Sequence, residues 1–239
     1  MTILCIETST SVCSAAICKD GVPAEQCICR EGSNHARLLP RYIEYLLQYA
    51  RNHNLTIDAV ALSEGPGSYT GLRIGTSTAK GLCYGMNVPL IPVPTLEVLC
   101  EAVLPKIENR KSKIVLIPMI DARRMEIYTM VDGETKAVVV ENEESLTSNS
   151  PKDGLTSNSE VVYYFGDGAA KCAKVFTKPN WYYIPDIVPE AQFMGALVER
   201  QKSIEKSGKS KEKSIDLAYY EPFYLKEFIA APSHIKGLK

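Results

Sequence analysis

The sequence predicts an α/β protein with two lobes. Short apolar runs of strand length alternate with longer segments of helical periodicity along most of its 239 residues. Three strand-like runs open the chain in succession, and Asp20-Gly21 between the second and third is a typical hairpin turn. A second series of strand-like runs begins near residue 113, after the first series has ended. Each series is expected to form its own sheet.

The first half is predicted to alternate strands and helices after an opening meander. Its strands are expected at 2–7, 13–18, 24–30, 59–63 and 90–93. Its helices are expected at 33–52, with Ser33 as the cap, at 70–86 and at 95–103. Three strands followed by helix, strand, helix and strand is the element order of ribonuclease H-like domains, from which sugar kinases and actin-like ATPases are built. We therefore expect mixed five-stranded sheets flanked by helices.

The second half is predicted to start a new sheet, with strands at 113–120, 125–131, 136–140 and 161–165. Gly166-Asp167-Gly168 leads into a short helix, and a further helix is expected from about residue 189 to 202. The string Leu-Thr-Ser-Asn-Ser occurs twice between 146 and 160, which favours a surface loop there. The predicted organisation is a first lobe at 1–104, a second at 105–218 with a lysine-rich connector at 202–213, and a tail at 219–239 that packs back on the body.

Composition and charge narrow the class of protein. The formal net charge is -1 and the isoelectric point is about 6.3, so the whole chain has no basic footprint for nucleic acid. No apolar run approaches the ~20 residues of a membrane-spanning helix, and the start has no signal-peptide pattern. The eight cysteines contain no Cys-x-x-Cys pair, and Cys27 and Cys29 alone do not make a zinc site. We expect a cytoplasmic protein with reduced thiols.

The most distinctive stretch is the glycine-rich string Glu64–Gly75, between a predicted strand and a predicted helix. It lacks the Gly-Lys-Ser/Thr of a phosphate-binding loop, and its glycine spacing misses the dinucleotide pattern by one residue. One interpretation is a shaped turn in which Ser68 or Thr70 caps the helix, and another is a rim that contacts a nucleotide or a partner. The residues of such a rim are Glu7, Glu64, Gly65, Gly67, Ser68, Thr70 and Arg73.

The sequence offers no complete catalytic constellation. Glu7 ends the first predicted strand, where a metal-dependent enzyme of this fold places a carboxylate, but no second ligand accompanies it. A His-x-x-x-His pair starting at His35 would need a histidine where Leu39 stands. No serine lies in a Gly-x-Ser-x-Gly elbow. We therefore predict neither catalytic residues nor a metal site.

The predicted helix at 33–52 is apolar over an unusually wide arc. A surface helix needs an apolar face of only ~100°, so the excess favours burial on two sides. The second side is covered either by a partner or by another segment of the chain, such as the aromatic tail. In the next helix Gly71, Gly75 and Thr78 make a small face that suits the close approach of another helix. The two apolar stripes of the first helix are Leu39, Ile43, Leu46, Leu47 and Ala50, and Leu38, Tyr42, Tyr45 and Tyr49.

Three motifs together resemble the TsaB family, also called YeaZ. They are Ile6-Glu7-Thr8-Ser9-Thr10, Asn34-His35-Ala36-Arg37-Leu38-Leu39-Pro40 and the glycine-rich string. The similarity is strong from residue 1 to about 100 and fainter through 121–124, 166–169 and 222–226. Members of the family are subunits of the bacterial machinery that makes threonylcarbamoyladenosine in tRNA. The resemblance implies the two-lobed ribonuclease H-like, actin-like fold of the sugar kinase–actin superfamily.

The resemblance also implies a non-catalytic subunit that activates the catalytic subunit TsaD, helps to dock the ATPase TsaE and reaches tRNA through the complex. No cofactor is expected on this chain, whereas ATP or ADP belongs to the complex. Family members use the first two helices to contact TsaD or a second TsaB copy. Two alternatives stay open: a glycopeptidase-like metalloenzyme, and an independent ATPase that uses Glu7 and Gly166-Asp167-Gly168. The residues expected to build the helix contact are Leu38, Tyr42, Tyr45, Tyr49, Gly71, Gly75 and Thr78.

Overall fold

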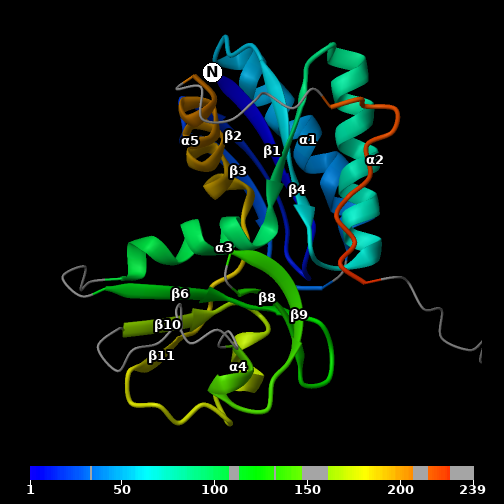
Figure 1. Cartoon of the computed structure of the whole chain (residues 1–239). Coiled ribbons are helices and arrows are strands. Elements are labelled where there is room, and N and C mark those ends of the chain that lie inside the picture. The colour runs from blue at the N-terminus through cyan, green and yellow to red at the C-terminus, as the bar shows by residue number, and fades with distance from the viewer. Residues whose placement is uncertain (33, 108–112, 132, 147–160, 207–214, 227–239) are drawn as a thin grey trace, which may run out of the picture.

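Two lobes, each built around β-strands, lie one above the other in the view of Figure 1. The computed structural model describes the chain apart from residues 33, 108–112, 132, 147–160, 207–214 and 227–239 (Figure 1). The loop predicted at 146–160 and most of the connector predicted at 202–213 therefore lie outside the described residues.

The first sheet has five strands in the order β3-β2-β1-β4-β5. The antiparallel strands are β1 (Thr2–Glu7), β2 (Cys13–Lys19) and β3 (Val22–Cys29), and β4 (Ala59–Gly65) and β5 (Leu90–Pro94) run parallel to β1. The hairpin between β2 and β3 turns at Asp20 and Gly21, whose φ angles of 50° and 81° are those that Asp-Gly favours. The predicted element order, three strands and then helix, strand, helix and strand, is thus confirmed for the first lobe.

Helices cover both faces of this sheet. On one face lie α1 (His35–Asn52) and α2 (Tyr69–Met86), and on the other lies α5 (Met194–Lys206) (Figure 1). α3 (Thr95–Val103) lies between the two lobes, with Val98 in the core under α5 and Leu96 and Leu99 packed against the second lobe. Successive residues of a strand point to opposite faces. Accordingly Leu4 and Ile6 pack under α1 and α2, whereas Ile3 and Cys5 pack under α5. Because both faces are covered, all of β1 is buried.

The second lobe contains two three-stranded sheets, β11-β10-β6 and β7-β8-β9. In the first, β6 (Ile114–Pro118), β10 (Val161–Phe165) and β11 (Trp181–Ile184) are parallel. In the second, β7 (Ile120–Asp121), β8 (Glu126–Val131) and β9 (Glu134–Val139) are antiparallel. Short helices complete the lobe and its connections: η1 (Leu104–Lys106), η2 (Glu143–Leu146), α4 (Ala169–Cys172) and η3 (Ala191–Phe193).

The two sheets of the second lobe share one continuous segment, residues 114–121. Taken along that segment, the order is β9-β8-β7/β6-β10-β11, which repeats the order of the first sheet. The Met119 amide still donates to the Phe165 carbonyl of β10 at 2.8 Å, and pairing with β8 begins at Ile120. The second five-stranded sheet that the sequence predicts is therefore present as two sheets among the described residues.

Parts of the second half differ from the sequence prediction. Strand β11 is missed, although its run Trp-Tyr-Tyr-Ile before Pro185 is of strand type. Helix α5 continues to Lys206 and not to 202, and its Met194, Leu197 and Val198 pack on the first sheet. The lobe boundaries at 104 and 218 stay a prediction, because α5 follows the second lobe in sequence but packs on the first lobe in space.

Residues 215–226, which we call the strap, run along the outer side of α2 (Figure 1). Lys80 Nζ donates to the carbonyls of Ala218 at 2.9 Å and Tyr220 at 3.2 Å. The Phe223 amide donates to the Glu64 carbonyl at 2.7 Å. Over these residues the predicted tail packs back on the body.

Candidate functional site

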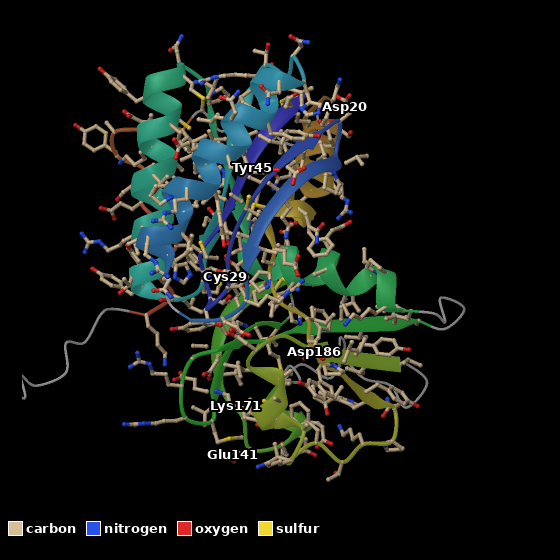
Figure 2. All side chains as sticks on the ribbon, turned by 180° about the vertical axis from the view of Figure 1, so that it is seen from behind. Asp20, Cys29, Tyr45, Glu141, Lys171 and Asp186 are labelled. Carbon is tan, nitrogen blue, oxygen red and sulfur yellow. The ribbon has the colours of Figure 1, made fainter. Side chains whose placement is uncertain are left out.

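A groove of about 800 Å³ lies between α1 and α2 on the outer face of the first lobe. Its apolar lining comes from Ile43, Leu47 and Tyr45 of α1, with Thr78 on the α2 side. Figure 2 shows Tyr45 on α1 in front of the sheet, and 52% of its surface is exposed. The polar lining consists of Arg41, Glu44, Gln48 and Arg51, with Pro40 at one end. An apolar centre with a polar rim is the usual anatomy of a protein–protein interface.

The two apolar stripes of α1 have different neighbours. Leu39 and Leu46 of the first stripe are fully buried against the sheet. In the second stripe Leu38, Tyr42 and Tyr49 are half-buried on the same core, and the Tyr49 hydroxyl donates to the Ala24 carbonyl of β3 at 3.3 Å. Most of the second stripe therefore packs within the lobe, and the stripe's member that lines the groove is Tyr45. The helical pattern did not indicate the polar lining of the groove, because those residues lie outside both apolar stripes.

Gly71 and Gly75 of α2 are buried against the turn that follows β1. A Cβ at Gly71 would lie 2.0 Å from the Thr8 carbonyl oxygen, and one at Gly75 would lie 2.3 Å from Thr8 Oγ1. The close approach that justifies these helical glycines is thus made within the chain. The prediction that these two glycines contact a partner is therefore corrected: they contact Thr8 of the same chain. Thr78, one turn further on, is half-buried and lines the groove.

The glycine-rich string shapes the start of α2 around the same turn. The Ser68 amide donates to the Ser9 carbonyl at 2.6 Å, and Ser68 Oγ accepts from the Gly71 amide at 3.3 Å. A Cβ at Gly67 would lie 2.2 Å from the Ser9 carbonyl oxygen. The predicted cap by Ser68 is confirmed, and Thr70 is an exposed residue of the first turn.

Glu7 is sealed beneath this turn and has no exposed surface. Its Oε1 accepts the Ser9 amide at 2.6 Å, while its Oε2 has no hydrogen-bond partner among the described residues. Burial raises the pKa of Glu7, and hydrogen bonds from Ser9, Ser63 and Thr8 oppose that rise. A carboxylate enclosed in this way is not exposed to a metal–nucleotide complex at the surface.

Two other residues of the predicted rim lie beside the strap. Arg73 Nη1 donates to the Tyr69 hydroxyl at 2.8 Å, and its guanidinium carbon lies 5.4 Å from the centre of the Tyr69 ring. Gly65 has a φ of 117°, and a Cβ there would lie 2.5 Å from the Phe223 carbonyl oxygen. The Glu64 carbonyl accepts the Phe223 amide, so Glu64 and Gly65 lie directly against the strap. Nucleotide contact at this rim stays a prediction.

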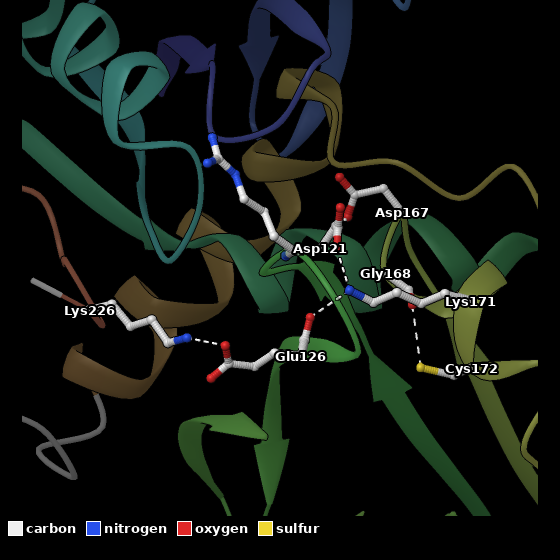
Figure 3. Close-up of polar contacts among 8 residues, drawn as sticks. Asp121, Glu126, Asp167, Gly168, Lys171, Cys172 and Lys226 are labelled. Carbon is white, nitrogen blue, oxygen red and sulfur yellow. Dashed lines mark hydrogen bonds and ion pairs between the residues drawn. The ribbon is translucent and has the colours of Figure 1, made fainter. Parts of the chain in front are cut away.

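A polar network joins the turn after β7 to α4 in the second lobe (Figure 3). Asp121 pairs with Lys171, and Lys171 Nζ also donates to the Glu126 carbonyl at 2.6 Å. Asp167 Oδ1 accepts the Asp121 amide at 2.9 Å. The neighbouring Gly166 has a φ of 108°, and a Cβ there would lie 2.1 Å from the Met119 carbonyl oxygen. The string at 166–168 is thus accounted for as a strand-to-helix turn.

The described part of the chain has no group of three or more His, Cys, Asp or Glu side chains arranged to hold a metal ion. Within the same residues, no helix combines the length and apolarity that crossing a bilayer requires. The α1–α2 groove is the candidate site that the geometry presents.

A family model described as "TsaD: tRNA N6-adenosine threonylcarbamoyltransferase" matches residues 30–150, which is half of the chain. The chain therefore belongs to the family that this model describes. Within it, the chain is a member of the TsaB (YeaZ) family, as the sequence motifs predict.

Several curated relatives are TsaB proteins. The chain is 34% identical over 130 residues to "tRNA threonylcarbamoyladenosine biosynthesis protein TsaB" of Haemophilus influenzae, and 38% identical over 130 residues to that of Escherichia coli. Each match covers 54% of this chain and, respectively, 52% and 53% of the relative. The chain thus spans about half the length of the curated relatives it matches.

Two solved structures share the fold over almost the whole chain. "YeaZ from Pseudomonas aeruginosa" superposes with a TM-score of 0.64 at 23% identity, covering 94% of this chain and 99% of that one. A second structure, of a protein "with similarity to peptidase YEAZ" from the same organism, gives a TM-score of 0.66 at 20% identity over 94% and 99% of the two chains. They confirm the predicted two-lobed α/β fold.

Proposed function

We propose that the chain is a non-catalytic subunit in tRNA threonylcarbamoyladenosine biosynthesis, which docks a TsaD-like catalytic subunit through the α1–α2 groove. The observation that carries this proposal is the groove itself. Ile43 and Leu47 give it an apolar lining, and Tyr45 stands exposed beside them. Tyrosine and arginine contribute disproportionately to binding energy at interfaces, and both line this groove.

The charged rim of the groove fixes the orientation of a partner that binds there. Arg41 and Arg51 lie at its ends along α1, with Glu44 and Gln48 between them. A partner that presents complementary charges is selected against one that places like charges opposite. The same face serves a second copy of this chain when the TsaD-like subunit is absent.

A non-catalytic role is supported by the surroundings of the residues that an enzyme would use. Glu7 is enclosed, and the glycines at 166 and 168 pack against 119–121 of their own lobe. In this proposal a TsaE-like ATPase is the third component, ATP or ADP is handled by the partners, and tRNA is reached through the complex in the cytoplasm. No observation favours the metalloenzyme or the independent ATPase.

Co-elution of the full chain with its TsaD-like subunit tests the proposal. Tyr45→Glu combined with Thr78→Arg places charge and bulk in the groove without touching the Thr8 turn. Tyr84→Glu is the matched control, because Tyr84 lies on α2, is 83% exposed and does not line the groove. We expect the double variant to elute alone and the control to co-elute. Co-elution of a folded double variant would place the contact elsewhere.

The alternatives have tests of their own. Stoichiometric zinc or iron in the purified chain would support a metalloenzyme. Tight binding of ATP with magnesium to the isolated chain, measured by calorimetry, would support an independent ATPase. Neither result is expected here.

A further inference from the structure

Three of the eight cysteines gather on one face of the first sheet, beneath α1. In the ladder between β2 and β3, Cys13 stands directly opposite Cys29, and Cys27 stands opposite Ala15. Residues two apart in a strand share a face, so Cys27 and Cys29 point to the same side. Cys13 and Cys27 both belong to the core that α1 covers, which places all three thiols on the α1 side.

Tyr42 of α1 lies over this group of thiols. The pKa of Tyr42 is raised first by burial and then by Cys29, Cys13 and Cys27. Tyr42 and Cys27 also pack against the same core as the buried Cys13. Figure 2 shows Cys29 at the end of the sheet that faces the second lobe.

Strand geometry selects one pair from the three. Residues directly opposite in an antiparallel ladder have Cα atoms about 4.5 or 5.5 Å apart. Both separations fall within the range of about 4.4–6.8 Å that disulfides adopt. Cys27 and Cys29 are separated along a single strand by about 6.6 Å, near the upper limit of that range. Cys13 and Cys29 stand directly opposite each other, so they are the pair that strand geometry favours.

The two members of the pair differ in access to solvent. Cys29 is the last residue of β3 and is half-buried, with its Sγ 3.1 Å from the Glu31 carbonyl oxygen. Cys13 is fully buried, and burial, with Cys29 and Glu7 nearby, raises its pKa to about 12. Because Cys29 is the more exposed of the two, it is the sulfur that an oxidant reaches first.

We propose that Cys13 and Cys29 are a dithiol that a hydroperoxide oxidises to a disulfide. The Cys29 thiolate attacks one peroxide oxygen, the O–O bond breaks, and hydroxide leaves to give a sulfenic acid. Cys13 then loses its proton and attacks the Cys29 sulfur, which forms the S–S bond and expels hydroxide. Each sulfur gives up one electron, and hydrogen peroxide becomes two molecules of water.

A second pair in the same sheet provides an internal contrast. The sulfurs of Cys5 and Cys18 lie 3.9 Å apart, and both residues are fully buried. If distance alone governed oxidation, this pair would react first. In the proposal, access of the oxidant to a sulfur atom decides which pair reacts. Cys13 and Cys29 are therefore oxidised, whereas the enclosed Cys5 and Cys18 stay reduced.

The test is peptide mapping of the full, unmodified chain after treatment with hydrogen peroxide, with free thiols blocked before digestion. We expect a peptide pair joined through Cys13 and Cys29 that has lost two hydrogen atoms and that dithiothreitol separates again. A folded Cys29→Ser variant should yield no such linkage, whereas Cys100→Ser, at a half-buried cysteine on α3, should yield it as the unmodified chain does. Linkage of Cys5 to Cys18, linkage through Cys27, or no linkage while Cys29 reaches the sulfinic state would overturn the proposal.

Discussion

At Gly71, the absence of a side chain lets the first turn of α2 touch the end of β1. The Thr8 hydroxyl donates to the Gly71 carbonyl at 2.8 Å, and the space where a Cβ would stand is filled by the Thr8 carbonyl. Gly81, further along the same helix, has nothing within 4 Å of its Cβ position. Gly71 is therefore required by close packing, whereas the space around Gly81 would accept a side chain.

This contrast predicts opposite effects of the same substitution. Gly71→Ala should lower the free energy of unfolding by about 1–3 kcal/mol or more, because the backbone of the turn has to move. Gly81→Ala should raise it by up to about 1 kcal/mol through helix propensity alone. Denaturant unfolding of the two variants measures both values. Equal effects at the two positions would show that packing on Thr8 does not explain Gly71.

The burial of Glu7 predicts that the stability of the fold depends on pH. Its pKa is raised in the folded chain above the ordinary value of 4.5, so in that range the folded state binds more protons than the unfolded state. Stability must then fall as pH rises from about 4.5 towards the folded-state pKa, by about 1.4 kcal/mol for each unit of pKa shift. Glu7→Gln, which can still accept the Ser9 amide, should escape this loss.

The measurement is the free energy of unfolding of both proteins between about pH 4 and pH 8. The two should be closest in stability at the acid end, where Glu7 is protonated in both states, and the variant should gain on the parent as pH rises. If the difference in the free energy of unfolding between the two proteins stayed constant across the range, the pKa of Glu7 would not be raised by folding.

At the level of elements, the sequence allowed the helices and most strands to be predicted, but not which neighbour covers each face. The apolar arc of α1 is visible in the sequence, yet only the structure shows that Leu38, Tyr42 and Tyr49 pack on the core of their own lobe. The Tyr49 hydroxyl also reaches β3. Helical glycines indicate a close approach without naming its partner, because any backbone satisfies the same spacing. Strand β11 was missed because four residues are too few for a period to emerge.

The contacts of Lys80 predict how firmly the strap is held on α2. Lys80→Met removes the two donors that hold the Ala218 and Tyr220 carbonyls while keeping the aliphatic stem. Amide exchange in residues 216–226 should become faster, with little change in β1 or β4. Lys174→Met, at an exposed lysine of the second lobe, is the control. Unchanged exchange in the strap would mean that Phe223 and the tyrosine contacts hold it without Lys80.

Across the whole molecule, the two lobes repeat one strand order and share two local features at the ends of strands. Gly65 follows β4 with a φ of 117°, and Gly166 follows β10 with a φ of 108°. The carboxylates that end β1 and β7 each accept the amide of the residue two further on, Ser9 at 2.6 Å and Arg123 at 3.0 Å. The lobes differ at the turn that follows, which is buried after Glu7 and exposed after Asp121. Because the first turn is enclosed, our proposal assigns docking to the outer helices of the first lobe.

The most direct measurement of this account is amide hydrogen exchange of the full chain with and without its TsaD-like subunit. If α1 and α2 form the docking face, peptides covering 38–52 and 69–86 should gain protection in the complex, while α5 and the strands of the second lobe exchange as before. Complex formation with protection confined to α5 or the second lobe, and none in α1 or α2, would contradict the central claim.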